Sequence, residues 1–294
     1  MISLFLFAIV MGLLLGSFYG FMALGLNIIF GTMKIVNLAH GDFIMLGGLL
    51  AFFLLRFYHI PLWMSFIIVT PAFFAGGFAL YTVLIPKVNK SDDREINSLI
   101  AFFGISMSVE AIISIAYGTT PRSLPLITLS TKYVDIFGFS ATTNYVVIAI
   151  ISITISAFTF FYLYVTRIGK ITRAVMYSEE ITQSLGINSK RIALLAFSIS
   201  VAITGIAGVM SPWVFGSIVP YEGALITIIA FTIIIIGALG NPLGAILGGL
   251  LYGVIISISD VYASSWSFVI VFTFLVIVMV IRPQGIFGRS LREA

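Results

Sequence analysis

The sequence has no cysteine and only two histidines, His40 and His59. The absence of cysteine excludes a disulfide framework and a thiolate metal site. The two histidines are too far apart along the chain to form a local metal-binding motif. We therefore expect neither a bound metal ion nor a cofactor.

Charged residues are also scarce. They make up 9% of the 294 residues, whereas soluble domains contain roughly 25%. Hydrophobic residues make up 60%, and the mean hydropathy is +1.18. A water-soluble fold cannot bury this much apolar surface, so we expect the protein to sit in a lipid bilayer.

Motifs for bond-breaking chemistry are missing. The pattern G-x-x-x-x-G-K-[ST] does not occur, so the chain is not expected to hold ATP phosphates in a P-loop. Paired carboxylates and a Ser-His-Asp set are also missing. The sequence therefore predicts no catalytic residue, and we expect a protein that is not an enzyme and has no nucleic-acid partner.

The apolar residues form continuous runs of about 16–27 residues, which are typical of membrane helices. The strands of a β-barrel would instead alternate apolar and polar residues. The predicted fold is an all-α polytopic bundle of about 8–10 transmembrane helices, in one membrane-spanning domain over residues 1–294. The expected helices lie near residues 4–30, 41–57, 61–85, 96–117, 143–166, 191–211, 222–239, 243–260 and 265–282.

Basic residues are concentrated in three segments, residues 86–95, 167–191 and 282–294. Lysine and arginine favour the cytoplasmic side of a membrane, so all three segments are predicted to lie there. The N-terminus would then be outside and the C-terminus inside, with the loop at 118–142 outside. The first apolar run has no basic segment before it, so we interpret it as a membrane helix rather than a signal peptide.

Glycines recur at helical spacing in several runs. Such faces of small residues allow helix backbones to touch, either in static packing or at a moving interface. The glycines are Gly12, Gly16 and Gly20, then Gly240, Gly244 and Gly248, and also Gly249 and Gly253.

A weak internal repeat is present. The string LGGLL occurs at 46–50 and at 247–251, and each copy follows a helix-breaking dipeptide, His40-Gly41 or Asn241-Pro242. Paired breaks in corresponding halves point to a transport site. Chance similarity in an apolar chain explains the repeat equally well.

The stretch FGTMKIVNLAHGDFIMLGG, residues 30–48, gathers polar side chains and glycines between two apolar runs. Irregular backbone at membrane depth is tolerated where it lines a cavity. We therefore predict a broken or re-entrant piece at residues 31–42. Together with the repeat, it makes Asn37, His40, Asp42 and Asn241 candidates for a translocation path. In the alternative interpretation, these side chains cap helix ends and fix the turn.

A short helix is predicted inside the segment at 167–191. Ser178 is a candidate N-cap, and Glu179 and Glu180 occupy the first turn, where the helix dipole favours carboxylates. Gly186 is suited to the position after the helix. A helix of about seven residues is not stable alone in water, so we expect a docked protein partner to hold it. The alternative is a capped surface turn between two membrane spans.

These motifs resemble those of the permease subunits of branched-chain amino acid ABC transporters. The resemblance rests on four motifs that occur in the same order over nearly the whole chain. They are GLNIIFGTMKIVNLAHGDFIMLGG, RAVMYSEEITQSLGIN, NPLGAILGGLLYG and IRPQGIFGR. The second motif is similar to the cytoplasmic coupling loop that fits a groove on the ATPase. The resemblance therefore implies that Ser178, Glu179, Glu180 and Gly186 couple the chain to an ATPase.

The resemblance also implies the partners and the membrane. The partners would be a homologous second permease subunit, two cytoplasmic ABC ATPases and an extracytoplasmic solute-binding protein. The membrane would be the cytoplasmic (inner) membrane of a bacterium or archaeon. Similar permeases serve branched-chain amino acids, other amino acids, urea and amides.

Two other classes were weighed against an ABC importer. One is an ion-coupled secondary transporter of small apolar or amide solutes, and the other is a membrane scaffold. Glu110, inside an expected span, would suit an ion or proton path, but a protonated or paired structural role is favoured, because no second carboxylate is expected at the same depth. The abundant glycines and central breaks argue against an inert scaffold.

Overall fold

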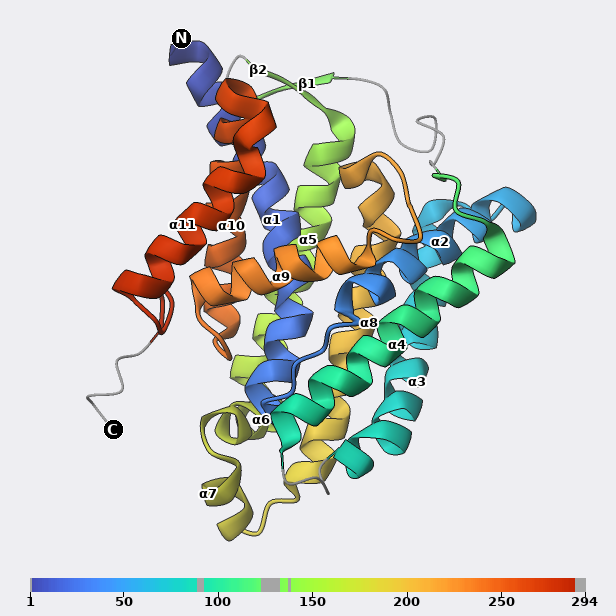
Figure 1. The fold of residues 1–294 in the computed structure, drawn as a ribbon, viewed down its shortest axis with the longest axis vertical. Coiled ribbons are helices and arrows are strands. Elements are labelled where there is room, and N and C mark those ends of the chain that lie inside the picture. The colour runs from blue at the N-terminus through green and yellow to red at the C-terminus, as the bar shows by residue number, and fades with distance from the viewer. Residues whose placement is uncertain (1, 89–92, 123–132, 137–138, 289–294) are drawn as a thin grey trace. The chain divides into compact units, whose positions relative to one another are not determined.

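The computed structural model describes residues 2–88, 93–122, 133–136 and 139–288 (Figure 1). Almost all of the regular structure in these ranges is helical. The elements are α1 (Ile2–Met33), α2 (His40–Tyr58), α3 (Leu62–Val88), α4 (Arg94–Tyr117), β1 (Tyr133–Ile136), β2 (Phe139–Thr142), α5 (Thr143–Val165), α6 (Arg167–Tyr177), α7 (Glu179–Ser184), α8 (Ser189–Phe215), α9 (Gly223–Gly237), α10 (Pro242–Ala263), η2 (Ser264–Trp266) and α11 (Ser267–Ile281).

Each expected helix is present, as α1 to α5 and α8 to α11, and the all-α membrane class is confirmed. Seven segments of the described chain are long and apolar enough to cross a membrane, compared with the eight to ten that we expected. The difference arises because α9 has only 15 residues and because α10, η2 and α11 together count as one apolar segment, Pro242–Ile281.

Two features were not predicted. The strands β1 and β2 form an antiparallel hairpin, with Tyr133 opposite Thr142. The helix α6 fills the first part of the segment at 167–191, in which the sequence predicts only the short helix after Ser178. Its start is capped by the Thr166 side chain, which accepts a hydrogen bond of 3.0 Å from the Gly169 N–H. Part of the 118–142 loop and the basic residues Lys90, Arg289 and Arg292 lie outside the described residues.

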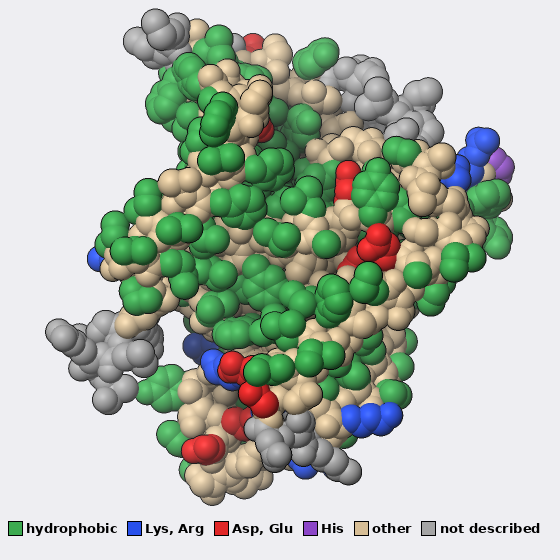
Figure 2. Space-filling model, viewed as in Figure 1, with side chains coloured by type: hydrophobic (Ala, Val, Ile, Leu, Met, Phe, Trp, Pro, Cys, Tyr) green, Lys and Arg blue, Asp and Glu red, His purple; other side chains and the backbone are tan. Residues whose placement is uncertain are grey.

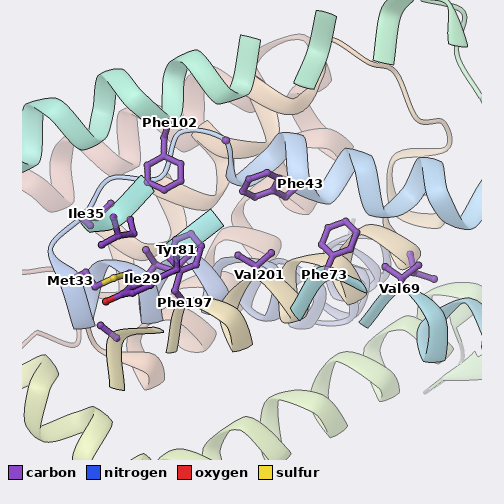
Figure 3. Packing of buried hydrophobic residues seen from close by; sticks show 14 of the residues in the cluster. Ile29, Met33, Ile35, Phe43, Val69, Phe73, Tyr81, Phe102, Phe197 and Val201 are labelled. Atoms are coloured by element: carbon purple, nitrogen blue, oxygen red, sulfur yellow. The ribbon is translucent and has the colours of Figure 1, made fainter. Parts of the chain in front are cut away.

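The described parts of Ile28–Thr128 and Thr159–Ile229 form one compact unit. In this unit α8 packs against α2 and α3, and α4 packs against both of them. Figure 3 shows the aromatic rings of Phe73, Tyr81, Phe102 and Phe197 meeting aliphatic side chains in the buried cluster of this unit. The cluster includes Ile29, Met33 and Ile35, so the end of α1 and the residues after it belong to the packed interior.

The described parts of Met1–Asn27, Leu129–Phe158 and Ala230–Ala294 form a second compact unit. Here the predicted small-residue face is a helix contact. A Cβ added at Gly16 or Gly20 would meet backbone atoms of α10 at 2.9 Å. The two helices therefore touch through their backbones, which requires glycine at these positions.

Hydrophobic side chains cover most of the face shown in Figure 2. Apolar residues on the outward sides of helices include Ile67, Ile115, Ile150 and Val280, each more than half exposed. Such surfaces suit contact with lipid or with another membrane subunit. Acidic and basic side chains gather mainly near α6 and α7, in the lower part of the view.

Candidate transport and coupling site

The predicted break in the chain is present, but it is shorter than expected. α1 continues to Met33 and α2 begins at His40, so the irregular segment covers residues 34–39 rather than 31–42. Lys34 has a positive φ of 54°, which turns the chain at the end of α1. Ile35, Asn37 and Ala39 are fully buried, so the helix break lies inside the protein.

Asn37 closes a local turn within the break. Its Oδ1 accepts a hydrogen bond of 3.1 Å from the Ala39 N–H. Its Nδ2 is buried and has no hydrogen-bond partner among the described residues. The backbone of the break is also bound from outside, because the Val36 N–H donates to Ser98 Oγ at 3.3 Å. The amide of Asn37 thus has both a structural acceptor and an unused donor.

His40 is fully buried at the start of α2. Its Nδ1 lies 3.5 Å from Oγ1 of Thr204 on α8. The next residue is fixed as well, because the Gly41 N–H donates to Thr227 Oγ1 at 2.8 Å. These contacts attach the beginning of α2 to α8 and to the first turns of α9.

Gly41 and Gly223 allow this attachment. A Cβ at Gly41 would collide with the carbonyl oxygen of Gly223 and would lie 2.7 Å from the Thr227 nitrogen. Both obstacles are backbone atoms, which cannot rotate away. The close backbone contact between the start of α2 and the start of α9 therefore requires glycine at both position 41 and position 223.

Asp42 lies in the same place, with an exposed fraction of 1%. Its carboxylate packs against Gly223, the first residue of α9. Neither carboxylate oxygen has a hydrogen-bond partner within the described ranges by distance and angle. Ser106 and Glu110 on α4 face it closely enough to interact electrostatically.

Asn241 belongs to the second unit, where it is a capping residue. Its Oδ1 accepts from the Leu243 N–H at 3.1 Å at the start of α10, and its Nδ2 donates to the Phe287 carbonyl at 3.1 Å. Asn27, which the sequence analysis missed, supports the same corner. It is fully buried, and its Nδ2 donates to the carbonyl oxygens of Ala238 and Asn241 at 3.2 and 2.7 Å. An asparagine deep in an apolar run was the available signal.

The short helix predicted after residue 177 is present as α7. Ser178 is its N-cap, and its Oγ accepts from the Ile181 N–H at 3.2 Å. At the other end Gly186 has a φ of 79°. The Gly186 N–H donates to the Gln183 carbonyl and the Ile187 N–H to the Thr182 carbonyl, at 2.9 and 3.3 Å. This is the Schellman arrangement, and it confirms the predicted helix end.

The two glutamates of α7 differ in their surroundings. Glu179 Oε1 accepts from Gln183 Nε2 and Ser189 Oγ, each at 3.2 Å. Its Oε2 lies 3.4 Å from Arg94 Nη1, which forms an ion pair with it. Glu180 is exposed to solvent. Glu179 therefore holds α7 in place, while Glu180 is available to a partner.

Large apolar side chains also point away from the protein at this helix. Ile181 and Leu185 are 58% and 74% exposed and lie four residues apart, which places them on one side of α7 and its C-cap. Tyr177 is 75% exposed, but it ends α6 and is separated from α7 by the extended residue Ser178. Exposed apolar side chains beside the exposed Glu180 carboxylate form a suitable docking surface for another protein.

A cleft of about 420 Å³ separates this segment from the end of α1. It is lined by Gly31, Thr32 and Lys34 on one side and by Val175, Met176, Tyr177, Ser178, Glu179, Glu180 and Gln183 on the other. The segment at 167–191 and the helix break are therefore neighbours in space, although many residues separate them in sequence.

The helices and the two polar regions define a multi-pass all-α membrane protein. A family model of the permease component of branched-chain amino acid transport systems matches residues 8–281. The chain belongs to this family of permease components.

Relatives with assigned names match over nearly the full length. The chain is 32% identical over 300 residues to the high-affinity branched-chain amino acid transport system permease protein BraD of Pseudomonas aeruginosa, covering 96% of this chain and 95% of the relative. It is 30% identical over 291 residues to the corresponding LivH protein of Salmonella typhimurium, covering 95% and 94%. It is 26% identical over 281 residues to a probable LivH protein of Methanocaldococcus jannaschii, covering 91% and 87%. No solved structure matches the chain.

Proposed function

We propose that the chain is the transmembrane permease subunit of an ATP-driven ABC importer for branched-chain amino acids. The observation that carries this proposal is the match to permease components over residues 8–281. The capped helix α7, with its exposed carboxylate and the exposed side chains of Ile181 and Leu185, supports it. An ion-coupled secondary transporter is not favoured, because the similar proteins are named as permeases of transport systems.

The remaining parts of the importer follow from the family. A second, homologous permease subunit would complete the translocation path in the membrane. Two cytoplasmic ABC ATPases would hydrolyse ATP, and a solute-binding protein outside would deliver the amino acid. The permease itself would catalyse no reaction.

The proposed ATPase contact is the coupling segment at 167–191, with α7 at its tip. Glu180, Ile181 and Leu185 are exposed and would enter the ATPase groove. Ser178, Glu179 and Gly186 would act indirectly, because they shape the helix and fix its position. In this proposal Glu180 contacts the ATPase directly, and Glu179 supports the helix that presents it.

The proposed translocation path includes the polar groups of the helix break. Asn37 Nδ2 and the Asp42 carboxylate oxygens are buried without a hydrogen-bond partner in the described ranges. Such groups cost free energy unless something satisfies them, and a passing amino acid could do so. His40 lies beside them at the start of α2. Asn241 is a weaker member of the proposed path, since both ends of its amide already bind backbone groups.

We further propose that the N-terminus is outside and the C-terminus is inside the cell. Single cysteines can test this because the chain has none of its own. Ser189, one of the positions that the basic segments suggest, is 2% exposed and unsuitable. Exposed Ser184 should resist an impermeant thiol reagent in intact cells as Ser184→Cys, and exposed Thr120 should react as Thr120→Cys. The reverse pattern would overturn the topology.

The experiment for the coupling role is Glu180→Lys, with Glu95→Lys as its matched control. Glu95 is also exposed and also lies in the first turn of a helix, α4. Each reversal costs about 0.3–1 kcal/mol of dipole stabilisation, so both variants should fold. We expect Glu180→Lys to weaken ATPase binding and transport-coupled ATP hydrolysis in reconstituted vesicles, and Glu95→Lys to leave both unchanged. Normal assembly and hydrolysis in Glu180→Lys would exclude α7 as the contact.

A further inference from the structure

Helix α7 is tied to the first turns of two long helices. Glu179 receives a hydrogen bond from Ser189, the first residue of α8, and pairs with Arg94, the first residue of α4. Gln183 donates to Ser189 Oγ at 2.7 Å and completes the network. These contacts connect α7 to the beginning of α4 and of α8.

The helix break is tied to the same turn of α4. Ser98 is fully buried, and its Oγ accepts from the Val36 N–H at 3.3 Å while donating to the Glu95 carbonyl at 2.7 Å. Arg94 and Ser98 are four residues apart, so they lie on one face of α4, about 6 Å apart along its axis. One helical turn thus contacts the coupling helix at one end and the break at the other.

We propose that Arg94 and Ser98 are positioning residues that connect the movement of α7 to the buried helix break. This inference rests on the proposed importer function. When the ATPases move α7, Glu179 pulls on the Arg94 guanidinium. Because a hydrogen-bonded helical turn moves as a rigid piece, Ser98 shifts with Arg94 and displaces the backbone at Val36. The polar groups of Asn37 and His40 follow this segment directly in the chain.

The cleft supports a mechanical link rather than a static brace. It lies between the coupling segment and the end of α1, and its lining includes Lys34 and Glu179. The two sides are therefore not fully packed together and have room to move. The α4 turn provides a hydrogen-bonded connection between them beside this space.

The test uses the complete importer, reconstituted in vesicles with its ATPases, second permease and binding protein. The readouts are leucine transported per ATP hydrolysed, and the ratio of ATP hydrolysis with and without leucine-loaded binding protein. Arg94→Gln should lower both by about two- to fivefold, the scale of a partly exposed ion pair. Ser98→Ala should lower them in the same direction. Arg94→Lys, which keeps the charge, should restore most of the loss.

Two control variants match these changes. Arg56→Gln removes an exposed basic residue from the last turn of α2, and Ser108→Ala removes an exposed hydroxyl from α4 that donates to the Gly104 carbonyl of its own helix. Both should behave as the unchanged protein. The double variant Arg94→Gln with Glu179→Gln should lose no more than the larger single loss, because both act through one contact.

The inference is overturned if Arg94→Gln and Ser98→Ala match their controls, or if they lower only the melting temperature and leave both ratios unchanged. It is also overturned if the Arg94 and Glu179 losses are additive. If Arg94→Gln does not assemble, the same two ratios are measured for Ser98→Ala and Arg94→Lys. A normal value of both ratios in Ser98→Ala then overturns the inference. Failure of the proposed function has a different signature, because the unchanged complex would then take up no leucine.

Discussion

The helix break at 34–39, with the first turn of α2, and the proposed coupling segment at 167–191 are both polar regions in an apolar chain, but they are stabilised in opposite ways. The coupling helix α7 is closed at both ends by neighbours in sequence, Ser178 and Gly186. The break is closed by residues far away in the chain, above all Thr227 and Gly223. Local caps produce an exposed helix that can meet a partner, whereas distant contacts produce a buried corner.

The largest expected effect is on the buried corner. Gly41→Ala places a methyl group against the backbone of Gly223 and Thr227, so α2 and α9 must separate. We expect a loss of about 3 kcal/mol in unfolding free energy, the upper part of the range for overpacking. The measurement is thermal unfolding of the purified complex in detergent.

Gly104→Ala is the matched control for that prediction. Gly104 is also inside a helix, but an added Cβ would meet no atom within 4 Å. This variant should be neutral or more stable by about 0.4–1 kcal/mol. If Gly41→Ala were as stable as Gly104→Ala, the backbone contact between α2 and α9 would be refuted.

A smaller effect is expected from the polar side chains of the break. We expect Asn37→Ala and His40→Ala to lower leucine uptake per folded complex by about tenfold, which corresponds to about 1.4 kcal/mol. Binding of leucine by the external protein should be unchanged. Uptake must be normalised to folded complex, because both side chains also contact Ala39 or Thr204.

Ser200→Ala separates a path role from a purely structural role. Ser200 is buried on α8 and donates to the Ala196 carbonyl of its own helix, so its removal reports the cost of deleting an interior hydroxyl. If Asn37→Ala and His40→Ala lose stability like this control but keep full uptake per folded complex, the break is a corner and not part of the path.

The smallest effects on the complex as a whole are expected from the caps of α7, because their cost is confined to this short helix. Ser178→Ala should cost about 1 kcal/mol, the usual value of an N-cap, and Gly186→Ala about 1–2 kcal/mol because its φ is positive. Hydrogen exchange of residues 179–184 should accelerate about fivefold or more. The melting temperature of the complex should hardly change, and a large fall would mean that α7 is part of the folding core.

The same contrast explains what could be predicted from sequence. The ends of α7 were correct because capping depends on residues within one turn. The position of the break was predicted correctly, but the predicted range of 31–42 was longer than the observed range of 34–39. No local signal showed that Gly31 remains helical and that α2 starts at His40. The approach of Gly41 to Gly223 was not visible, because a glycine in an apolar run has many possible partners.

Two omissions had different causes. Helix α6 could have been found, because Ile168, Ile171 and Val175 follow helical spacing between charged residues. The contacts of Arg94 with Glu179 and of Ser98 with Val36 join segments far apart in the chain. Such pairs follow from the packing of α4 and have no signal in a single sequence.

The most direct test of the account is leucine uptake by vesicles that contain the chain with its second permease, ATPases and binding protein. We predict uptake that requires ATP on the ATPase side, requires the binding protein on the other side and persists when ion gradients are dissipated. Uptake that is driven by a proton or sodium gradient without ATPases would contradict the importer assignment and support the ion-coupled alternative.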